Sequence, residues 1–125
     1  MTAAADTIAG RVRGFRPRLG AALRAEDGSI HVGANVENAA YPQGQCAEAS
    51  AIGALIAAGR KRITEVAVIS DGDDFCVPCG GCRQRLREFI VPGAEIHMVG
   101  AAGQKITSTL ETLLPRSFGP EYLPG

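Results

Sequence analysis

The hydrophobic positions along the first part of the chain change between helical and strand-like spacing. Apolar residues recur at helical spacing over residues 2–13, where we expect a first helix. Two apolar runs, 19–25 and 30–35, flank a turn sequence at 26–29 that has Asp-Gly at its centre. Asp-Gly between two such runs is a strong hairpin signal. We therefore predict an antiparallel hairpin over 19–25 and 30–35.

Helices and strands are expected to alternate along the rest of the chain. A polar loop is expected over 36–45, followed by a helix over 46–59 and a strand over 64–70. The next helix has apolar positions at Leu86, Phe89 and Ile90 and ends before Pro92. After it we expect a strand over 95–99, a short strand over 105–107, a helical turn at 110–114 and a surface tail from Pro120. Interleaved strands and helices predict an α/β fold, in three layers (α/β/α) with a mixed central sheet of about five strands.

Size and charge narrow the class of protein. A chain of 125 residues with 46% apolar types predicts one domain over residues 1–125. The 13 basic side chains are balanced by 13 acidic ones. The sequence therefore predicts no strongly positive surface that would bind nucleic acid or anionic lipid. The longest uncharged apolar stretch, residues 49–59, is too short to cross a bilayer. The N-terminal segment lacks a hydrophobic signal region, so we expect a cytoplasmic protein without membrane or nucleic-acid partners.

Four cysteines, Cys46, Cys76, Cys79 and Cys82, suggest metal ligands or reactive thiols in this setting. Cys46 and the Cys-x-x-Cys pair at 79 and 82 each begin a predicted helix, where unpaired N–H groups stabilise thiolates. Three thiolates leave the fourth position of a tetrahedral Zn²⁺ open, as a catalytic site requires. Glu48 follows in the first helical turn and can reach that position as a proton shuttle.

A purely structural zinc site is the alternative interpretation. It would use Cys76 as a fourth ligand, although Pro78 makes it difficult for Cys76, Cys79 and Cys82 to share one ion. A Cys-x-x-Cys motif alone would favour the structural role. Its combination with Cys-Ala-Glu thirty residues upstream of Cys76 favours a catalytic zinc site.

These motifs, in this order, resemble the cytidine deaminases of the small homotetrameric, zinc-dependent type. The matching segments are 33–41 (GANVENAAY), 46–48 (CAE), 78–84 (PCGGCRQ) and 113–118 (LLPRSF). The resemblance implies one Zn²⁺ per chain, with Cys46, Cys79 and Cys82 as ligands and Glu48 as the catalytic proton carrier. It implies hydrolysis of cytidine and 2′-deoxycytidine to uridine and 2′-deoxyuridine with release of ammonia, a reaction of pyrimidine salvage.

The resemblance also implies the contacts of the nucleoside. Asn35 and Glu37 would bind the ribose, chiefly its 3′-hydroxyl, and Ala47 would contribute to substrate binding. Phe118 would reach into the site of a neighbouring subunit of the homotetramer. Without the resemblance, Asn35 and Glu37 would be interpreted as solvated loop residues and Phe118 as a packing residue.

Ala49 and the segment at 15–19 depart from the family pattern. Family members usually carry Arg directly after the catalytic Glu, where it bonds the thiolates, and this chain has Ala49. Three thiolates and Zn²⁺ leave a negative charge in excess, which we expect Arg83 and the two helix N-termini to offset. Ala49 and an altered segment at 15–19 keep a second substrate open, another aminopyrimidine nucleoside such as blasticidin S. A non-catalytic zinc-stabilised binding module is a further alternative, but such a module has no use for Glu48.

Overall fold

The computed structural model describes most of the chain after the N-terminal segment, namely residues 19–36, 39–40, 42, 44–70, 78, 80–100 and 102–124. The helix expected over 2–13 lies outside these residues. Glu37, Cys76 and Cys79 lie outside them as well.

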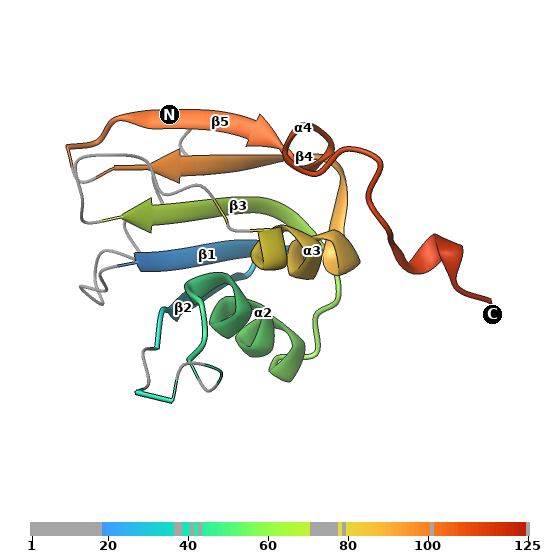
Figure 1. Cartoon of the computed structure of the whole chain (residues 1–125), viewed down its shortest axis with the longest axis horizontal. Coiled ribbons are helices and arrows are strands. Elements are labelled where there is room, and N and C mark those ends of the chain that lie inside the picture. Colours follow the sequence, from blue (N-terminus) through green and yellow to red (C-terminus); the bar gives the residue numbers. More distant parts are fainter. Residues whose placement is uncertain are drawn as a thin grey trace.

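Five strands form one mixed sheet in the order β2-β1-β3-β4-β5 (Figure 1). Their bounds are Leu19–Ala25 for β1, Ile30–Ala34 for β2, Ile63–Ser70 for β3, Ile90–Val99 for β4 and Lys105–Thr109 for β5. β3 and β4 are parallel, and the other neighbouring pairs are antiparallel. The predicted mixed sheet of five strands and the predicted hairpin are both confirmed.

The described helices cover one face of this sheet (Figure 1). They are α2 (Ala47–Ala57), α3 (Gly80–Phe89) and α4 (Leu110–Leu113), and a short 3-10 turn, η2 (Pro120–Tyr122), lies in the tail. Leu55 of α2, Leu86 of α3 and Leu110 of α4 join Leu23 and Val66 of the sheet in the larger core. No helix among the described residues is long and apolar enough to cross a membrane.

The opposite face of the sheet carries a smaller cluster of Ala22, Ala67, Ile69 and Val99. The helix expected over 2–13 belongs to the predicted three-layer arrangement. That helix is not among the described residues, so the third layer stays a prediction.

β4 begins at Ile90, five residues before the start expected for this strand. Pro92 and Gly93 therefore lie inside the strand, where the sequence pattern suggested only a break. Consecutive pairs of the β3–β4 ladder are Ile63 with Ile90 and Glu65 with Glu95. Four residues of β4 bulge opposite one residue of β3, and a bulge tolerates a proline that cannot donate to the ladder. Gly93 adopts a φ of 76° there, which glycine accepts without strain.

The strand directions bring the beginnings of α2 and α3 to one edge of the sheet. β1 is antiparallel to both β2 and β3, so these two strands run the same way. Their last residues, Ala34 and Ser70, pair with Gly20 and Leu19 at the start of β1. The segments that leave β2 and β3 at this edge lead to α2 and α3. Side chains at the two helix N-termini can therefore meet.

Candidate metal centre

β2 and the first turns of α2 approach each other closely. A Cβ atom on Gly33 would lie 2.6 Å from the carbonyl oxygen of Ala47 and 2.7 Å from Cβ of Ser50, and it would also clash with the backbone nitrogen of Ala51. Only glycine permits this packing. The Ser50 hydroxyl also donates to the carbonyl oxygen of Ala34 at 3.0 Å. The first turn of α2 is thereby held against the end of β2.

A short bridge places Asn35 next to the start of α2. The backbone groups of Val36 and Gln45 exchange hydrogen bonds of 2.7 and 2.8 Å. Asn35 precedes this bridge and Cys46 follows it. The Asn35 side chain is fixed as well, because its Oδ1 accepts a hydrogen bond of 3.1 Å from the backbone N–H of Leu19. A predicted sugar-binding residue and a predicted metal ligand therefore flank the same backbone pair.

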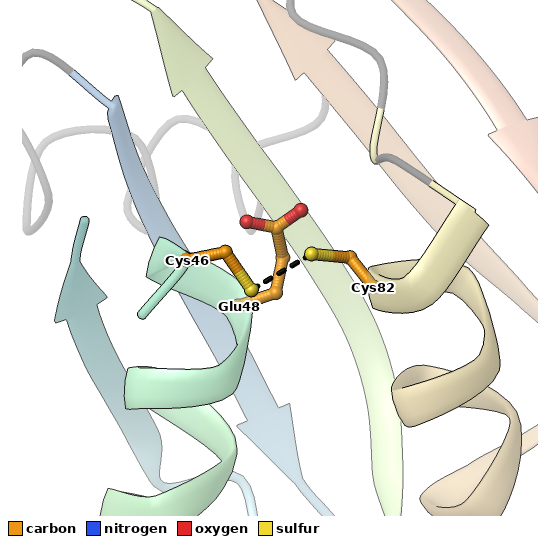
Figure 2. Close-up of side chains that lie close together, drawn as sticks. All are labelled: Cys46, Glu48 and Cys82. Carbon is orange, nitrogen blue, oxygen red and sulfur yellow. Dashed lines mark hydrogen bonds between the residues drawn. The ribbon is translucent and has the colours of Figure 1, made fainter. Parts of the chain in front are cut away.

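The sulfurs of Cys46 and Cys82 meet between the two helices (Figure 2). Cys46 is the N-cap residue of α2, and Cys82 lies in the first turn of α3. Their Sγ atoms are 2.8 Å apart, and both residues are free thiols. Cys82 is 1% exposed. Both sulfurs lie at helix N-termini, which are the positive ends of the helix dipoles.

Glu48 completes this cluster from the first turn of α2. One ligand atom from each of Cys46, Glu48 and Cys82 lies within 4.8 Å of the others. Figure 2 shows the Glu48 carboxylate extending past the two sulfurs. The residue is 6% exposed, although carboxylates are rarely buried without a function or a partner.

The donor set suits zinc. Soft thiolate sulfurs on two helix N-termini are characteristic zinc ligands, and a carboxylate beside them is a common companion. Two of the three predicted ligands, Cys46 and Cys82, are brought together here. The third predicted ligand, Cys79, lies outside the described residues, as does Cys76.

The other predicted site residues are distributed around this centre. Ala47 is buried in the larger core, so only its backbone can face a ligand. Arg83 points elsewhere: its Nε donates to the carbonyl oxygen of Pro78 at 2.8 Å, and its Nη1 donates to that of Leu113 at 2.5 Å. These bonds give Arg83 a structural role, and its expected effect on the charge of the centre stays a prediction.

Arg85 is a site residue that the sequence motifs did not indicate. Its Nη1 donates to Sγ of Cys46 across 3.7 Å. Helical spacing offered a signal, because Arg85 follows Cys82 by three residues and residues so spaced lie on one side of a helix.

Phe118 is 55% exposed on the C-terminal tail, and it stacks on Tyr122 with ring centroids 5.7 Å apart. The tail is fastened to α3. Gln84 Nε2 donates to the Phe118 carbonyl at 3.0 Å, and Arg87 Nε donates to Ser117 Oγ at 2.8 Å. Arg87 also forms a salt bridge with Glu121. The segment that carries Phe118 and Tyr122 is thus held on α3 by these bonds.

Comparisons with known proteins agree with this arrangement. The family described as "Cytidine and deoxycytidylate deaminase zinc-binding region" matches residues 1–98. A cytidine deaminase of Sporosarcina psychrophila is 37% identical over 105 residues, which are 84% of this chain and 77% of that protein. The chain therefore belongs to the family of zinc-dependent cytidine and deoxycytidylate deaminases.

Solved structures lead to the same family. The crystal structure of cytidine deaminase from Burkholderia pseudomallei superposes with a TM-score of 0.81 at 31% identity, over 94% of this chain and all of that one. The enzyme from Mycobacterium leprae gives a TM-score of 0.73 at 32% identity, over 89% of this chain and 97% of that one. The fold expected from the resemblance is confirmed.

Proposed function

We propose that this protein hydrolyses cytidine and 2′-deoxycytidine to uridine and 2′-deoxyuridine with release of ammonia. The observation that carries the proposal is the buried carboxylate of Glu48 beside the sulfurs of Cys46 and Cys82. A zinc site that only stabilises a fold needs ligands and no further buried acid. Membership of the deaminase family supplies the reaction class.

Cys46, Cys79 and Cys82 would hold one Zn²⁺ per chain. When bound, the ion supplies a water molecule of lowered pKa next to the pyrimidine ring. The thiolates need a protein environment that tolerates negative charge, and the two helix N-termini provide part of it.

Glu48 moves the protons of the reaction. Its carboxylate accepts a proton as oxygen is added to C4 of the ring, and it delivers a proton to N3. It then transfers the second proton of the water to the departing amino group, which leaves as ammonia. Atoms balance, since nucleoside and water give the deaminated nucleoside and ammonia. Burial of Glu48 supports this role, because a carboxylate removed from bulk water exchanges protons with the substrate rather than with solvent.

Asn35 and Glu37 bind the ribose in this proposal. The Asn35 side-chain oxygen already accepts from Leu19, so contact with a sugar hydroxyl would come from its NH₂ end. The Val36–Gln45 bridge supports the role of Asn35, since it joins the segment of Asn35 to the segment of Cys46. The backbone N–H groups at the beginning of α2, including that of Ala47, would bind polar atoms of the base.

Phe118 acts on a neighbouring copy of the chain in this proposal. Its exposure and its fastening to α3 support a contribution to another subunit's site. The protein would then work as a homotetramer of single domains over residues 1–125. We place it in the cytoplasm and in pyrimidine salvage, without nucleic-acid or membrane partners.

The proposed substrate can be tested by ammonia release from a panel of nucleosides by the zinc-loaded protein. We expect cytidine and 2′-deoxycytidine to be turned over and free cytosine to be a poor substrate. If only blasticidin S is turned over, the substrate is another aminopyrimidine nucleoside and not cytidine. Zinc-loaded protein that releases ammonia from no member of the panel would contradict the proposal.

A further inference from the structure

Arg85 connects α3 to the thiol at the beginning of α2. Its guanidinium donates a hydrogen bond to Cys46 Sγ, with 3.7 Å between Nη1 and the sulfur. Arg85 and Cys82 are three residues apart on α3 and therefore lie on the same side of that helix. The Cys82 thiol and the Arg85 guanidinium on this side of α3 both contact Cys46 Sγ.

The other two arginines of α3 have different partners. Arg83 binds the carbonyl oxygens of Pro78 and Leu113, and Arg87 binds groups in the C-terminal tail. Within the described part of the chain, Arg85 is the cationic side chain that contacts a sulfur of the centre.

α2 contributes no charged residue to the hollow that Arg85 lines. Arg85 lines a hollow of about 460 Å³ between the two helices. The side chains that α2 contributes to this hollow are Ala49, Ile52 and Gly53, and Glu88 of α3 lines it as well. Arg85 of α3 is therefore the positively charged side chain among the residues that line this hollow.

A guanidinium in this position changes the energetics of metal binding. Zn²⁺ with three thiolates has an excess negative charge, and the Glu48 carboxylate adds another. A guanidinium that is hydrogen-bonded to a metal-bound thiolate offsets part of this negative charge. Groups that hydrogen-bond to metal ligands typically change metal affinity by about 10–100-fold.

We propose that Arg85 is a positioning residue of the metal centre, which holds the Cys46 thiolate and compensates its charge. The inference rests on the zinc site of the proposed function, and it goes beyond that function because it assigns charge compensation to a specific side chain. Ala49 lines the same hollow, so a cation introduced at residue 49 should replace the effect of Arg85.

The test is the zinc dissociation constant, measured without substrate by competition with a chromogenic chelator at fixed pH and ionic strength. Arg85→Gln should weaken binding by about 10–100-fold, and Arg85→Lys should weaken it less because the charge remains. Arg62→Gln is the matched control, since Arg62 is exposed and follows the C-terminal end of α2. It should bind zinc as the parent does. Addition of Ala49→Arg to Arg85→Gln should recover much of the lost affinity.

Equal zinc affinities of the Arg85→Gln and Arg62→Gln proteins would overturn the inference. A second result would also overturn it. In that result Arg85→Gln weakens zinc binding but also destabilises the metal-free protein, and neither Arg85→Lys nor Ala49→Arg restores the affinity. Because no substrate is present, this result is independent of the reaction. An effect of Arg85 on zinc in a protein that deaminates nothing would overturn the proposed function and leave this inference intact.

Discussion

The thiol sulfurs of Cys46 and Cys82 lie 2.8 Å apart, although the two residues are 36 positions apart in the chain. The sheet explains this contact. β2 and β3 end at the same edge, and the segments that follow them lead into α2 and α3. Two helix N-termini therefore lie side by side (Figure 2), each with a cysteine in or before its first turn.

Removal of one of these thiols should remove the metal. We expect about one zinc per parent chain, and Cys46→Ser or Cys82→Ser should lose most of it because a three-ligand site cannot spare a ligand. Cys76→Ser is the matched control and should retain zinc, since Cys76 is not a predicted ligand. Atomic absorption of the purified proteins gives the answer. Full zinc content in both the Cys46 and Cys82 variants would show that the ion is held elsewhere.

The approach of β2 to α2 predicts a large difference between two glycines. Gly33→Ala should lower the free energy of unfolding by about 1–3 kcal/mol or more, because the added methyl overlaps the backbone of α2. Gly53→Ala should raise stability by about 0.5–1 kcal/mol, since Gly53 is an exposed helix residue with open space around it. Urea unfolding of the two variants measures both values. Equal stabilities would mean that β2 and α2 are not packed this closely.

The link between Arg87 and Glu121 should protect the tail from proteolysis. Arg87→Gln removes the salt bridge, so chymotrypsin should cleave faster after Phe118. A backbone hydrogen bond at Glu121 itself, and then the bond from Arg87, lower the pKa of that carboxyl. The link should therefore persist at mildly acidic pH and weaken as the pH falls through this lowered pKa. Arg116→Gln, an exposed arginine of the same tail, is the control, and an identical cleavage rate in both variants would show that Arg87 does not restrain the tail.

Recognition of the sugar should depend on Asn35. Asn35→Ala should lower kcat/KM for cytidine by at least about tenfold, because a sugar hydroxyl would lose a partner in a desolvated site. The same variant should lose much less with 3′-deoxycytidine, on which we expect the parent to be slow because the hydroxyl that Asn35 would bind is missing. Steady-state kinetics with both nucleosides form a double-mutant cycle between side chain and hydroxyl. An equal loss on both substrates would assign Asn35 to the local structure alone, where it binds Leu19.

Much of the fold could be predicted because local signals agree with the final arrangement. The Asp-Gly turn marked the β1–β2 hairpin, and the Ala-rich run after Cys46 marked α2. The start of β4 was placed too late because Pro92 and Gly93 normally end an element. A bulge opposite β3 accommodates them, and no local pattern reveals which strand will lie alongside.

The candidate site also has a part that the sequence predicts and a part that depends on packing. Cys46, Glu48 and Cys82 carry chemistry in short motifs, so their types and spacing indicated the centre. Arg85 belongs to no motif, and its contact with Cys46 depends on how α3 packs beside α2. Arg83, next to Cys82 in sequence, points toward Leu113 for the same reason. Proximity in sequence to a ligand does not determine which arginine reaches the sulfurs.

The central claim is that Glu48 carries the protons of a zinc-dependent deamination. Glu48→Gln keeps the shape of the side chain and removes its ability to accept a proton. The most direct measurement determines zinc content and the rate of ammonia release from cytidine in the same preparation of this variant. We expect about one zinc per chain and a rate at least ~10²-fold below that of the parent. A variant that retains zinc and deaminates cytidine at nearly the parent rate would contradict the account.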